Sequence, residues 1–250
     1  MGELQRLFFD PQIIWETLPT LFREGLKNTL LLAIGALVIG FAFGMVLALM
    51  GISRRWWVRL PAVVYIDIFR GLPAILTIAL VGLGMPTAGF RPFGRERLFY
   101  GILALGLIST AYIAEILRAG IQSVDKGQME AARSVGMTYM MAMRLIIIPQ
   151  GLRRVLPPLT NEAIAITKDS SLVFVIGLAA GERELFRVGQ NIGQQTGNFS
   201  PYVAAGLVYL LITIPLTRLV NVLDKRLREG RRVATAPGAE ELPASVEVQP

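Results

Sequence analysis

Residues 30–52 read LLLAIGALVIGFAFGMVLALMGI and contain no charged side chain. An α-helix rises about 1.5 Å per residue, so roughly 20 apolar residues in a helix cross a bilayer core about 30 Å thick. This stretch is therefore predicted to be a membrane-spanning helix. Its glycines and alanines are the small residues that allow membrane helices to pack closely.

The whole chain has the composition of a membrane protein with several spans. Of its 250 residues 53% are hydrophobic and 17% are charged, and the mean hydropathy is +0.54. A soluble domain carries about 25% charged residues, so this chain has too few to cover a water-facing surface. Intrinsic disorder is excluded for most of the chain, because it requires low hydrophobicity and high charge. Cysteine and histidine are absent, which excludes disulfides and imidazole chemistry, and we expect neither a catalytic residue nor a metal site.

Four further segments have the length of a membrane span. They are residues 60–85, 98–119, 152–176 and 201–222. The first of them is interrupted by Asp67, Arg70, Gly71 and Pro73, and residues 152–176 are unusually polar. The predicted fold is therefore all-α, a polytopic membrane protein with about five transmembrane helices.

Basic residues predict the orientation of these helices. They collect in three segments: Arg54, Arg55 and Arg59 after the first span; Lys126, Arg133, Arg144, Arg153 and Arg154 after the third; Lys225, Arg226, Arg228, Arg231 and Arg232 after the fifth. Cytoplasmic loops are enriched in Lys and Arg, so we expect the N-terminus outside and the C-terminus in the cytoplasm. Arg91, Arg95 and Arg97 disagree, because they fall in a predicted outer loop. No basic run is interleaved with aromatics as in a nucleic-acid groove, so the net charge of +7 predicts no nucleic-acid partner.

The chain divides into three predicted regions. Residues 1–28 form an external interfacial segment, in which residues 8–22 mix aromatics with acidic residues and prolines; no cleaved signal peptide is expected. Residues 29–228 form the transmembrane domain. Residues 229–250 are rich in Pro, Ala and Glu and are predicted to be a disordered cytoplasmic tail.

The segment between the third and fourth spans, residues 121–154, is too long for a simple turn. We predict two short amphipathic helices, the first over residues 124–135 and stopped by Gly136. Thr138 caps the second, and Pro149 ends it by withholding a backbone donor. Their apolar face is predicted to lie against the membrane domain or a soluble partner. It contains Met129, Ala132, Val135, Tyr139, Met140 and Met143.

This segment resembles the EAA signature of ATP-binding-cassette (ABC) importer permeases. The matching residues are Glu130, Ala131, Ala132, Gly136, Ile146 and Pro149, with Ile148 standing where the pattern usually has Leu. Other segments resemble the polar amino-acid uptake branch of that family: YIDIFRGLP at 65–73, AYIAEILRAG at 111–120, LPP at 156–158 and KDSSL at 168–172. The resemblance extends over about residues 25–227.

The resemblance implies a type I importer fold in a prokaryotic inner membrane. Residues 29–228 would be a permease domain that pairs with a second permease copy or a homologue. An extracytoplasmic substrate-binding protein would deliver the amino acid, and the coupling loop, residues 121–150, would dock on a nucleotide-binding ATPase subunit. The chain contains no Gly-x-x-x-x-Gly-Lys-Ser/Thr motif, so we expect ATP and Mg on that partner and no cofactor on this chain.

The polar fourth span is the predicted substrate path. Glu162 and Asp169 are seven residues apart, about two helical turns, so both carboxylates fall on one face. Ionisable residues within a membrane normally face a bundle interior, an aqueous cavity or one another. The candidate path residues are Asn161, Glu162, Thr167, Asp169, Ser170 and Ser171, with Asp67 and Arg70 of the second span. Alternatively, Lys168 and the two carboxylates form internal ion pairs or helix caps, and the sequence leaves both interpretations open.

Two further charge pairs have a spacing of three residues. Asp67 and Arg70 can pair on one helix face beside the break at Gly71 and Pro73. Discontinuous helices expose backbone groups that bind substrate in transporters, but we favour a neutralised pair that stabilises a kink. Glu115 and Arg118, at the cytoplasmic end of the third span, are predicted to form an interfacial salt bridge.

The leading hypothesis is a permease subunit of an ATP-driven importer of polar amino acids. The alternative is an ion-coupled secondary amino-acid transporter that uses Glu162 and Asp169 as ion sites; inverted repeats would favour it, and none is convincing. An intramembrane hydrolase ranks last. It needs a nucleophile with an adjacent base, and no Ser–Lys or paired-Asp spacing supports one.

Overall fold

The computed structural model describes residues 2–233, with side chains up to residue 222, and this part of the chain is helical without strands. The α-helices are α1 (Glu3–Phe8), α2 (Pro11–Thr20), α3 (Lys27–Gly51), α4 (Trp56–Gly71), α5 (Ala74–Ala79), α6 (Met85–Thr87), α7 (Arg97–Gln122), α8 (Lys126–Ser134), α9 (Tyr139–Ala142), α10 (Ile148–Asp169), α11 (Leu185–Thr196) and α12 (Ser200–Val233). Three π-helical segments, Leu21–Leu26, Leu80–Gly84 and Met143–Ile147, and a 3₁₀ segment, Ser170–Ile176, join some of them. The all-α prediction is confirmed for the described residues.

The first span is part of a longer helix. α3 (Lys27–Gly51) lies within three residues of the predicted limits, and the π-helical turn Leu21–Leu26 joins it to α2 without a break. Asp10 caps α2, because its Oδ1 accepts hydrogen bonds from the backbone N–H groups of Gln12 and Ile13 at 3.0 and 3.3 Å. The boundary expected at residue 28 therefore falls inside continuous helix.

The second predicted span, residues 60–85, is broken. α4 and the helical segment Ala74–Thr87 meet at an angle of 103°. Leu72 between them is extended, with φ −82° and ψ 140°, as expected for a residue that precedes a proline. The predicted interruption at Gly71 and Pro73 is confirmed as a sharp bend.

Length and hydropathy distinguish the remaining spans. Three helices of the described part are long and apolar enough to cross a membrane, namely Glu3–Gly51, α7 and residues 200–222 of α12, and the bent pair at residue 72 adds a fourth. α10 has 22 residues, about 33 Å of helix, but it is too polar to pass the same test. The count of five spans thus depends on α10. α12 continues to Val233, and residues 234–250 of the predicted tail lie outside the described part.

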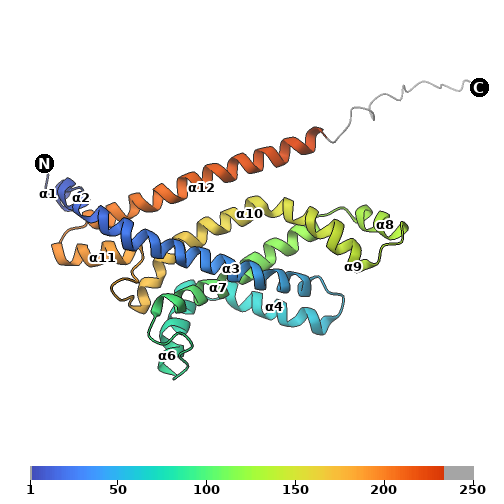
Figure 1. Cartoon of the computed structure of the whole chain (residues 1–250), viewed down its shortest axis with the longest axis horizontal. Helices are drawn as coiled ribbons and strands as arrows, with labels where there is room; N and C mark the ends of the chain where they lie inside the picture. The colour runs from blue at the N-terminus through green and yellow to red at the C-terminus, as the bar shows by residue number, and fades with distance from the viewer. Residues whose placement is uncertain (1, 234–250) are drawn as a thin grey trace, which may run out of the picture.

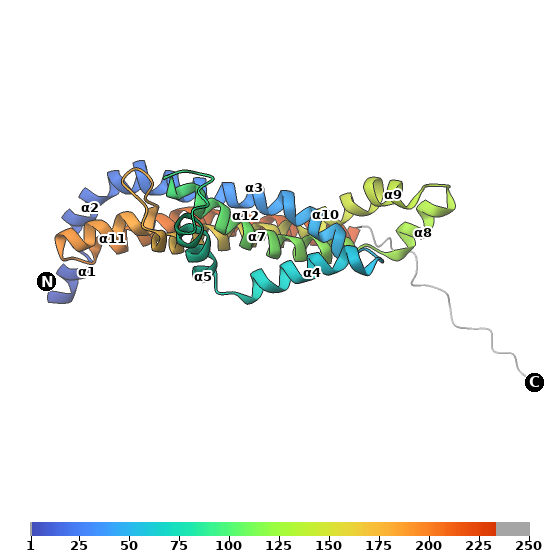
Figure 2. The same ribbon diagram turned by 90° about the horizontal axis from the view of Figure 1, so that it is seen from below.

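α3 and α7 run side by side in the same direction (Figures 1 and 2) and form the main packed interface. Small residues bring their backbones together. A Cβ on Gly44 would lie 3.1 Å from the backbone N of Ala114, and one on Gly106 would lie 2.9 Å from Ile39 Cγ2. Ser109 Oγ also donates a hydrogen bond to the Ala36 carbonyl at 2.8 Å. We call this interface, which also includes Gly35 and Gly40, the α3–α7 seam.

α10 returns along α7 in the opposite direction and packs apolar side chains such as Val155 and Ile166 against the α3 and α7 side chains. The two helices cross at a pair of glycines, where a Cβ on Gly151 would lie 2.9 Å from Ile121 Cα and one on Gly120 would lie 2.9 Å from the Gly151 carbonyl oxygen. Arg154 Nη1 also donates to the Ser123 carbonyl at the same crossing. α10 further contacts α12 and α3, which places it inside the bundle.

The three basic segments predicted from the sequence lie at one end of the bundle. The α3–α4 turn, the α8–α9 hairpin and the end of α12 all point the same way, while α1 and α11 lie at the opposite end (Figure 1). The expectation that these segments share one side is confirmed.

Candidate functional site

The coupling loop contains a helical hairpin whose turns follow the predicted local signals. α8 starts at Asp125, whose Oδ1 accepts a hydrogen bond from the Gly127 backbone N–H at 2.7 Å. It ends before Gly136, which has φ +86°, a conformation that glycine adopts without strain. Thr138 Oγ1 accepts from the Met141 backbone N–H at 3.2 Å and begins α9. The predicted stop and cap are confirmed.

The prediction that Pro149 ends the second helix is wrong. α9 passes through the π-helical segment Met143–Ile147 directly into α10, and Pro149 is the second residue of α10. A π-helical turn shifts the hydrogen bonding of the residues before it, and such turns accommodate a residue that lacks a backbone N–H inside a continuous helix. Pro149 therefore lies within continuous helix near the start of α10.

The apolar face of the hairpin divides into a packed half and an exposed half. Ala132 and Met143 are buried, the latter in a cluster with Ile121 and Ile147. Exposure is high at the other half, at 75% for Val135, 55% for Tyr139 and 71% for Met140. We call these last three residues the α8–α9 tip. Large apolar side chains gathered at a projecting tip indicate a surface that another protein covers.

The EAA residues likewise divide between exposed and packed positions. Glu130, Ala131, Gly136 and Pro149 are exposed, whereas Ala132 is buried and Ile146 is half-buried. The buried pair faces the bundle, and the exposed residues are available to a partner. The EAA pattern thus includes residues that pack the hairpin against the bundle and residues that form its exposed surface.

The carboxyl groups of α10 make no salt bridge with any described side chain. Glu162 and Asp169 are half-buried, and Lys168 is exposed. Within residues 2–222, where side chains are described, none of the three makes a salt bridge within 4.0 Å. The alternative of ion pairing among these residues is not observed there, and two carboxyl groups without a salt-bridge partner lie along α10.

The polar residues around these carboxylates differ in exposure. Asn161 is exposed, and Ser171, in the 3₁₀ segment after α10, is half-buried with its hydroxyl donating to the Lys168 carbonyl at 2.7 Å. Thr167 and Ser170 are buried, and their hydroxyls donate to the carbonyls of Ala163 and Thr167 at 2.8 and 2.7 Å. Because the hydroxyl protons of Thr167 and Ser170 are already donated, their oxygens can only accept further hydrogen bonds.

The predicted pair between Asp67 and Arg70 is wrong. Asp67 is exposed and makes no ion pair within 4.0 Å of a described side chain, while Arg70 Nη1 lies 3.9 Å from Glu115 Oε2. The Arg70 guanidinium also lies over the Tyr112 ring, 5.5 Å from its centroid, and both contacts draw it towards α7. Arg70 therefore links α4 to α7.

The predicted pair on α7 is confirmed. Arg118 Nη2 donates to Glu115 Oε2 at 2.7 Å, and Arg118 Nε donates to Glu115 Oε1 at 3.0 Å. Together with Arg70 these residues form a chain of three charges across α4 and α7. Its two arginines leave one net positive charge.

Glu184 is a residue that sequence reasoning missed. It is fully buried, and its carboxylate accepts hydrogen bonds from the Arg187 backbone N–H at 2.7 Å and from the Tyr209 hydroxyl at 3.1 Å. It caps α11, which is not a membrane-spanning helix. Burial raises the pKa of Glu184 to about 7, although backbone hydrogen bonds from Phe186 and Arg187 oppose this rise. A glutamate directly before an amphipathic helix was the available signal.

Residues of the first span hold the loop that contains Glu184. Glu24 Oε1 accepts from the Gly181 backbone N–H at 2.7 Å, and Asn28 Nδ2 donates to the carbonyls of Gly181 and Arg183 at 2.9 and 3.0 Å. Thr29 Oγ1 accepts from the Leu185 backbone N–H at 3.1 Å. We call this set, with Glu184, the loop clamp. It fixes the end of the bundle opposite the coupling loop.

Comparisons with known proteins agree with this arrangement. A family model described as the binding-protein-dependent transport system inner membrane component matches residues 24–229. The chain is 38% identical over 211 residues to the probable glutamine ABC transporter permease protein GlnM of Bacillus subtilis, covering 84% of this chain and 95% of that protein. It is 36% identical over 224 residues to the glutamate/aspartate import permease protein GltK of Escherichia coli O6:H1, covering 87% and 98%.

A solved structure of an amino acid ABC transporter is similar to this fold. The TM-score is 0.72 at 37% sequence identity, and the match covers 90% of this chain and 99% of that one. A MetNI methionine ABC transporter in an inward-facing conformation matches with a TM-score of 0.59 at 20% identity, which shows a shared fold. The fold of this chain thus has a counterpart in solved transporters.

Proposed function

This chain belongs to the family of binding-protein-dependent transport system inner membrane components, and from that premise we propose how it works. It is a multi-pass membrane protein and the permease subunit of an ABC importer for amino acids. Relatives are named for glutamine, glutamate and aspartate, arginine, and octopine. Polar amino acids are accordingly its substrate class. These names favour ATP-driven import over the ion-coupled alternative.

The single observation that carries the mechanism is the exposed α8–α9 tip within the EAA loop. Val135, Tyr139 and Met140 project from the hairpin, while Ala132 and Met143 anchor it to the bundle. A separate ATPase subunit covers the tip and hydrolyses ATP with Mg, and this chain binds neither. Closure of the ATPase moves the hairpin, and α10, which continues from it, moves with it.

The side of α10 that carries Glu162 and Asp169 supplies the substrate path. Glu162 or Asp169 meets the ammonium group of the amino acid, and Asn161 and Ser171 offer hydrogen bonds beside them. Arg70 and Arg118 share the single carboxylate of Glu115, which leaves one net positive charge. Arg70 is therefore suited to bind the carboxylate of the amino acid. A second permease copy or a homologue covers the other side of the path, and a substrate-binding protein delivers the amino acid to the end that carries α11.

The orientation follows from the basic end of the bundle. The coupling loop and the end of α12 face the cytoplasm, where Lys and Arg collect, and the N-terminus lies outside. The protein resides in a prokaryotic inner membrane. This orientation puts the ATPase where ATP is available.

The test is uptake of a labelled amino acid by proteoliposomes that contain the assembled permease–ATPase complex and a binding protein. We expect the variant Glu130→Lys/Gly136→Pro to lose at least about 90% of uptake while still inserting in the membrane, because a charge reversal and a broken turn alter the docking surface. The variant Glu3→Lys is the control, since Glu3 is exposed at the opposite end. Unchanged uptake in the loop variant would refute the coupling role, and uptake by this chain alone under an ion gradient would favour the secondary transporter.

A further inference from the structure

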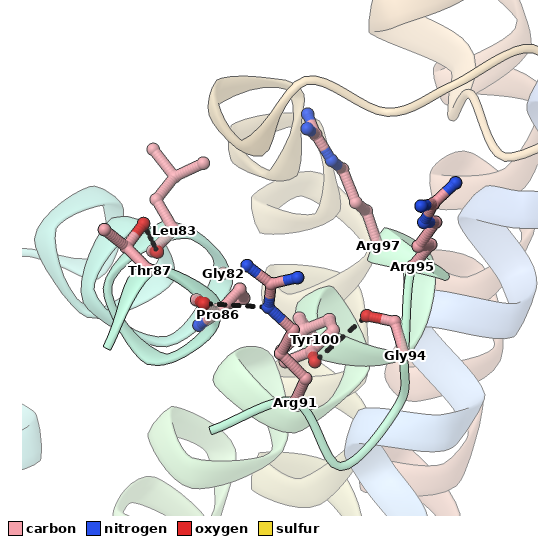
Figure 3. A pocket seen from close by; sticks show the side chains of 9 residues that line it. All are labelled: Gly82, Leu83, Pro86, Thr87, Arg91, Gly94, Arg95, Arg97 and Tyr100. Carbon is pink, nitrogen blue, oxygen red and sulfur yellow. Dashed lines mark hydrogen bonds between the residues drawn. The ribbon is translucent and has the colours of Figure 1, made fainter. Parts of the chain in front are cut away.

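A cavity of about 400 Å³ lies between residues 80–87, which form the π-helical segment Leu80–Gly84 and α6, and the start of α7 (Figure 3). Its lining includes Arg91, Arg95 and Arg97, together with Thr87 and Tyr100. Small-molecule sites in proteins have volumes of about 300–1,000 Å³. The cavity is therefore large enough for a small ligand, and its wall is dominated by positive charge.

The three arginines have no acidic partner among the described side chains. No carboxylate lies within 4.0 Å of any of them among the side chains of residues 2–222, and this includes the neighbouring Glu96. Arg97 Nη1 donates to the carbonyls of Ile176 and Gly177, both at 2.7 Å, and so ties α7 to the end of the 3₁₀ segment. Arg91 uses only Nε, which donates to the Pro86 carbonyl at 3.0 Å. The two terminal nitrogens of Arg91 and the whole Arg95 guanidinium keep their donors free of protein partners in the described part.

The loop that carries Arg91 and Arg95 is fixed by its own packing. The Phe93 ring lies edge-on to the buried Tyr100 ring at a centroid distance of 5.2 Å. Gly94, with φ +60°, supplies the turn, and the Tyr100 hydroxyl donates to its carbonyl at 3.4 Å. Donors held in place before a ligand arrives lose less conformational entropy on binding. The arginines thus belong to an ordered wall.

The start of α7 adds to the positive potential. Arg97 and Tyr100 lie in its first turn, and Glu96 at the N-cap makes no side-chain hydrogen bond to the helix. The N-terminus of a helix of 26 residues carries a partial positive charge that favours anions. The helix end and the guanidinium groups therefore favour the same kind of ligand.

We propose that this arginine pocket, lined by Arg91, Arg95 and Arg97, is a binding site for an oxyanion, either a carboxylate or a phosphate group. A guanidinium matches both groups through paired N–H donors. No residue of α10 is among those that line the pocket, and the function of the pocket does not depend on the proposed transport path. The oxyanion comes either from a soluble anion or from the headgroup of an anionic lipid. Such a site explains why three arginines occupy a loop that disagrees with the basic-loop pattern.

The experiment measures binding to the full-length chain purified in detergent. The soluble probes are radiolabelled inorganic phosphate and succinate, a dicarboxylate that lacks an ammonium group, in equilibrium dialysis. The lipid probes are phosphatidylglycerol and phosphatidylcholine in native mass spectrometry. The pocket variant is Arg91→Gln/Arg95→Gln. The control is Arg6→Gln/Arg23→Gln, which removes two exposed arginines from the same end of the bundle.

We expect at least one anionic probe to bind the wild-type chain and to bind the pocket variant about tenfold more weakly or worse, because charge-assisted hydrogen bonds are lost. The control keeps wild-type affinity. The variant Arg91→Lys/Arg95→Lys, which keeps the charges but not the paired donors, binds with intermediate affinity and guards against a fold defect. Binding of the soluble anions identifies a site for a free ligand, and a preference for phosphatidylglycerol alone identifies a headgroup site. The proposal is overturned if no anionic probe binds, or if the pocket and control variants lose binding equally.

Discussion

The α3–α7 seam and the α8–α9 tip belong to one continuous part of the chain, but they use side-chain size in opposite ways. In the seam, glycines such as Gly44 and Gly106 leave no room for an added carbon. At the tip, Val135 and Met140 hold large apolar side chains in the open. The seam is complete within this chain, whereas the proposed function assigns the tip to contact with the ATPase subunit. Substitutions in the seam should therefore reduce stability, and substitutions at the tip should reduce assembly and transport.

The largest expected effect on stability is that of Gly44→Leu. The added side chain meets the backbone N of Ala114 at 3.1 Å and the Thr110 carbonyl oxygen at 3.2 Å, and backbone atoms inside two packed helices cannot move aside. Overpacking of this kind costs about 3 kcal/mol, the upper part of the usual range. Thermal melting of the purified chain in detergent should show a clear loss of stability.

The matched control for this prediction is Gly206→Leu. A Cβ on Gly206, in α12, has no atom within 4 Å, so the same substitution should leave the melting temperature of the chain nearly unchanged. Equal losses in both variants would mean that the seam is no tighter than the exposed side of α12.

The next effect tests whether the polar loop clamp behaves like the seam. The pKa of Glu184 is about 7 in the folded protein and its ordinary value is 4.5, so the folded state retains a proton that the unfolded state has lost between these pH values. Stability is then greatest below about pH 4.5, falls by up to about 3 kcal/mol as the pH rises to about 7, and is constant above that. Glu184→Gln should remove this slope, measured by melting at several pH values.

Glu3→Gln is the control for the clamp, because Glu3 is exposed. It should keep the pH dependence of the wild type. If stability still depends on pH in Glu184→Gln, other groups cause that dependence. Glu184 would then contribute no pH-dependent stability to the loop clamp.

At the tip we expect a large effect on ATPase binding and a small effect on stability. The variant Val135→Asp/Met140→Asp should therefore fold normally. Surface substitutions usually change stability by about 0.5 kcal/mol or less, so melting of the isolated chain stays near the wild-type value. Burying each apolar side chain contributes about 1.5–3 kcal/mol, so affinity for the ATPase subunit should fall at least about tenfold. Pull-down of the ATPase with tagged permease measures this loss.

Leu4→Asp/Phe9→Asp is the matched control for the tip. These residues are 74% and 58% exposed, similar to the tip, but they lie at the other end of the bundle. ATPase binding should be unaffected by this change. Reduced binding in the control alone would place the docking surface at the wrong end and contradict the distinction between seam and tip.

The sequence predicted α3 and the hairpin because both depend on local signals, whereas it did not predict which helix α3 packs against. Uncharged length predicted α3, and Gly136 and Thr138 predicted the turn between α8 and α9 through backbone conformation and capping. Pro149 was misread because a proline that ends one helix and a proline that begins the next look alike in sequence. Only the π-helical connection through residues 143–147 distinguishes them.

The contacts that failed to emerge from the sequence are those made across long separations. Glu184 is held by Tyr209, and its loop is held by Glu24 and Asn28, more than 150 residues earlier. Nothing in the local pattern at residues 177–184 reveals such partners. Likewise, Arg70 was assigned to Asp67, its neighbour on the same helix. In the fold its guanidinium lies 3.9 Å from Glu115 of α7 and makes its ion pair there, not with Asp67.

Arg70→Gln is expected to change stability only slightly, and it sharpens the comparison from inside the bundle. The contact of Arg70 with Glu115 is 3.9 Å long and its side chain is 46% exposed, so the pair contributes less than about 1 kcal/mol. Arg118→Gln breaks two shorter hydrogen bonds to the same carboxylate and should lower the melting temperature more. If Arg70 meets the substrate carboxylate, Arg70→Gln should instead raise the KM for uptake with little change in melting. A residue within the membrane domain would then behave like the tip, because its partner, the transported amino acid, also comes from outside the chain.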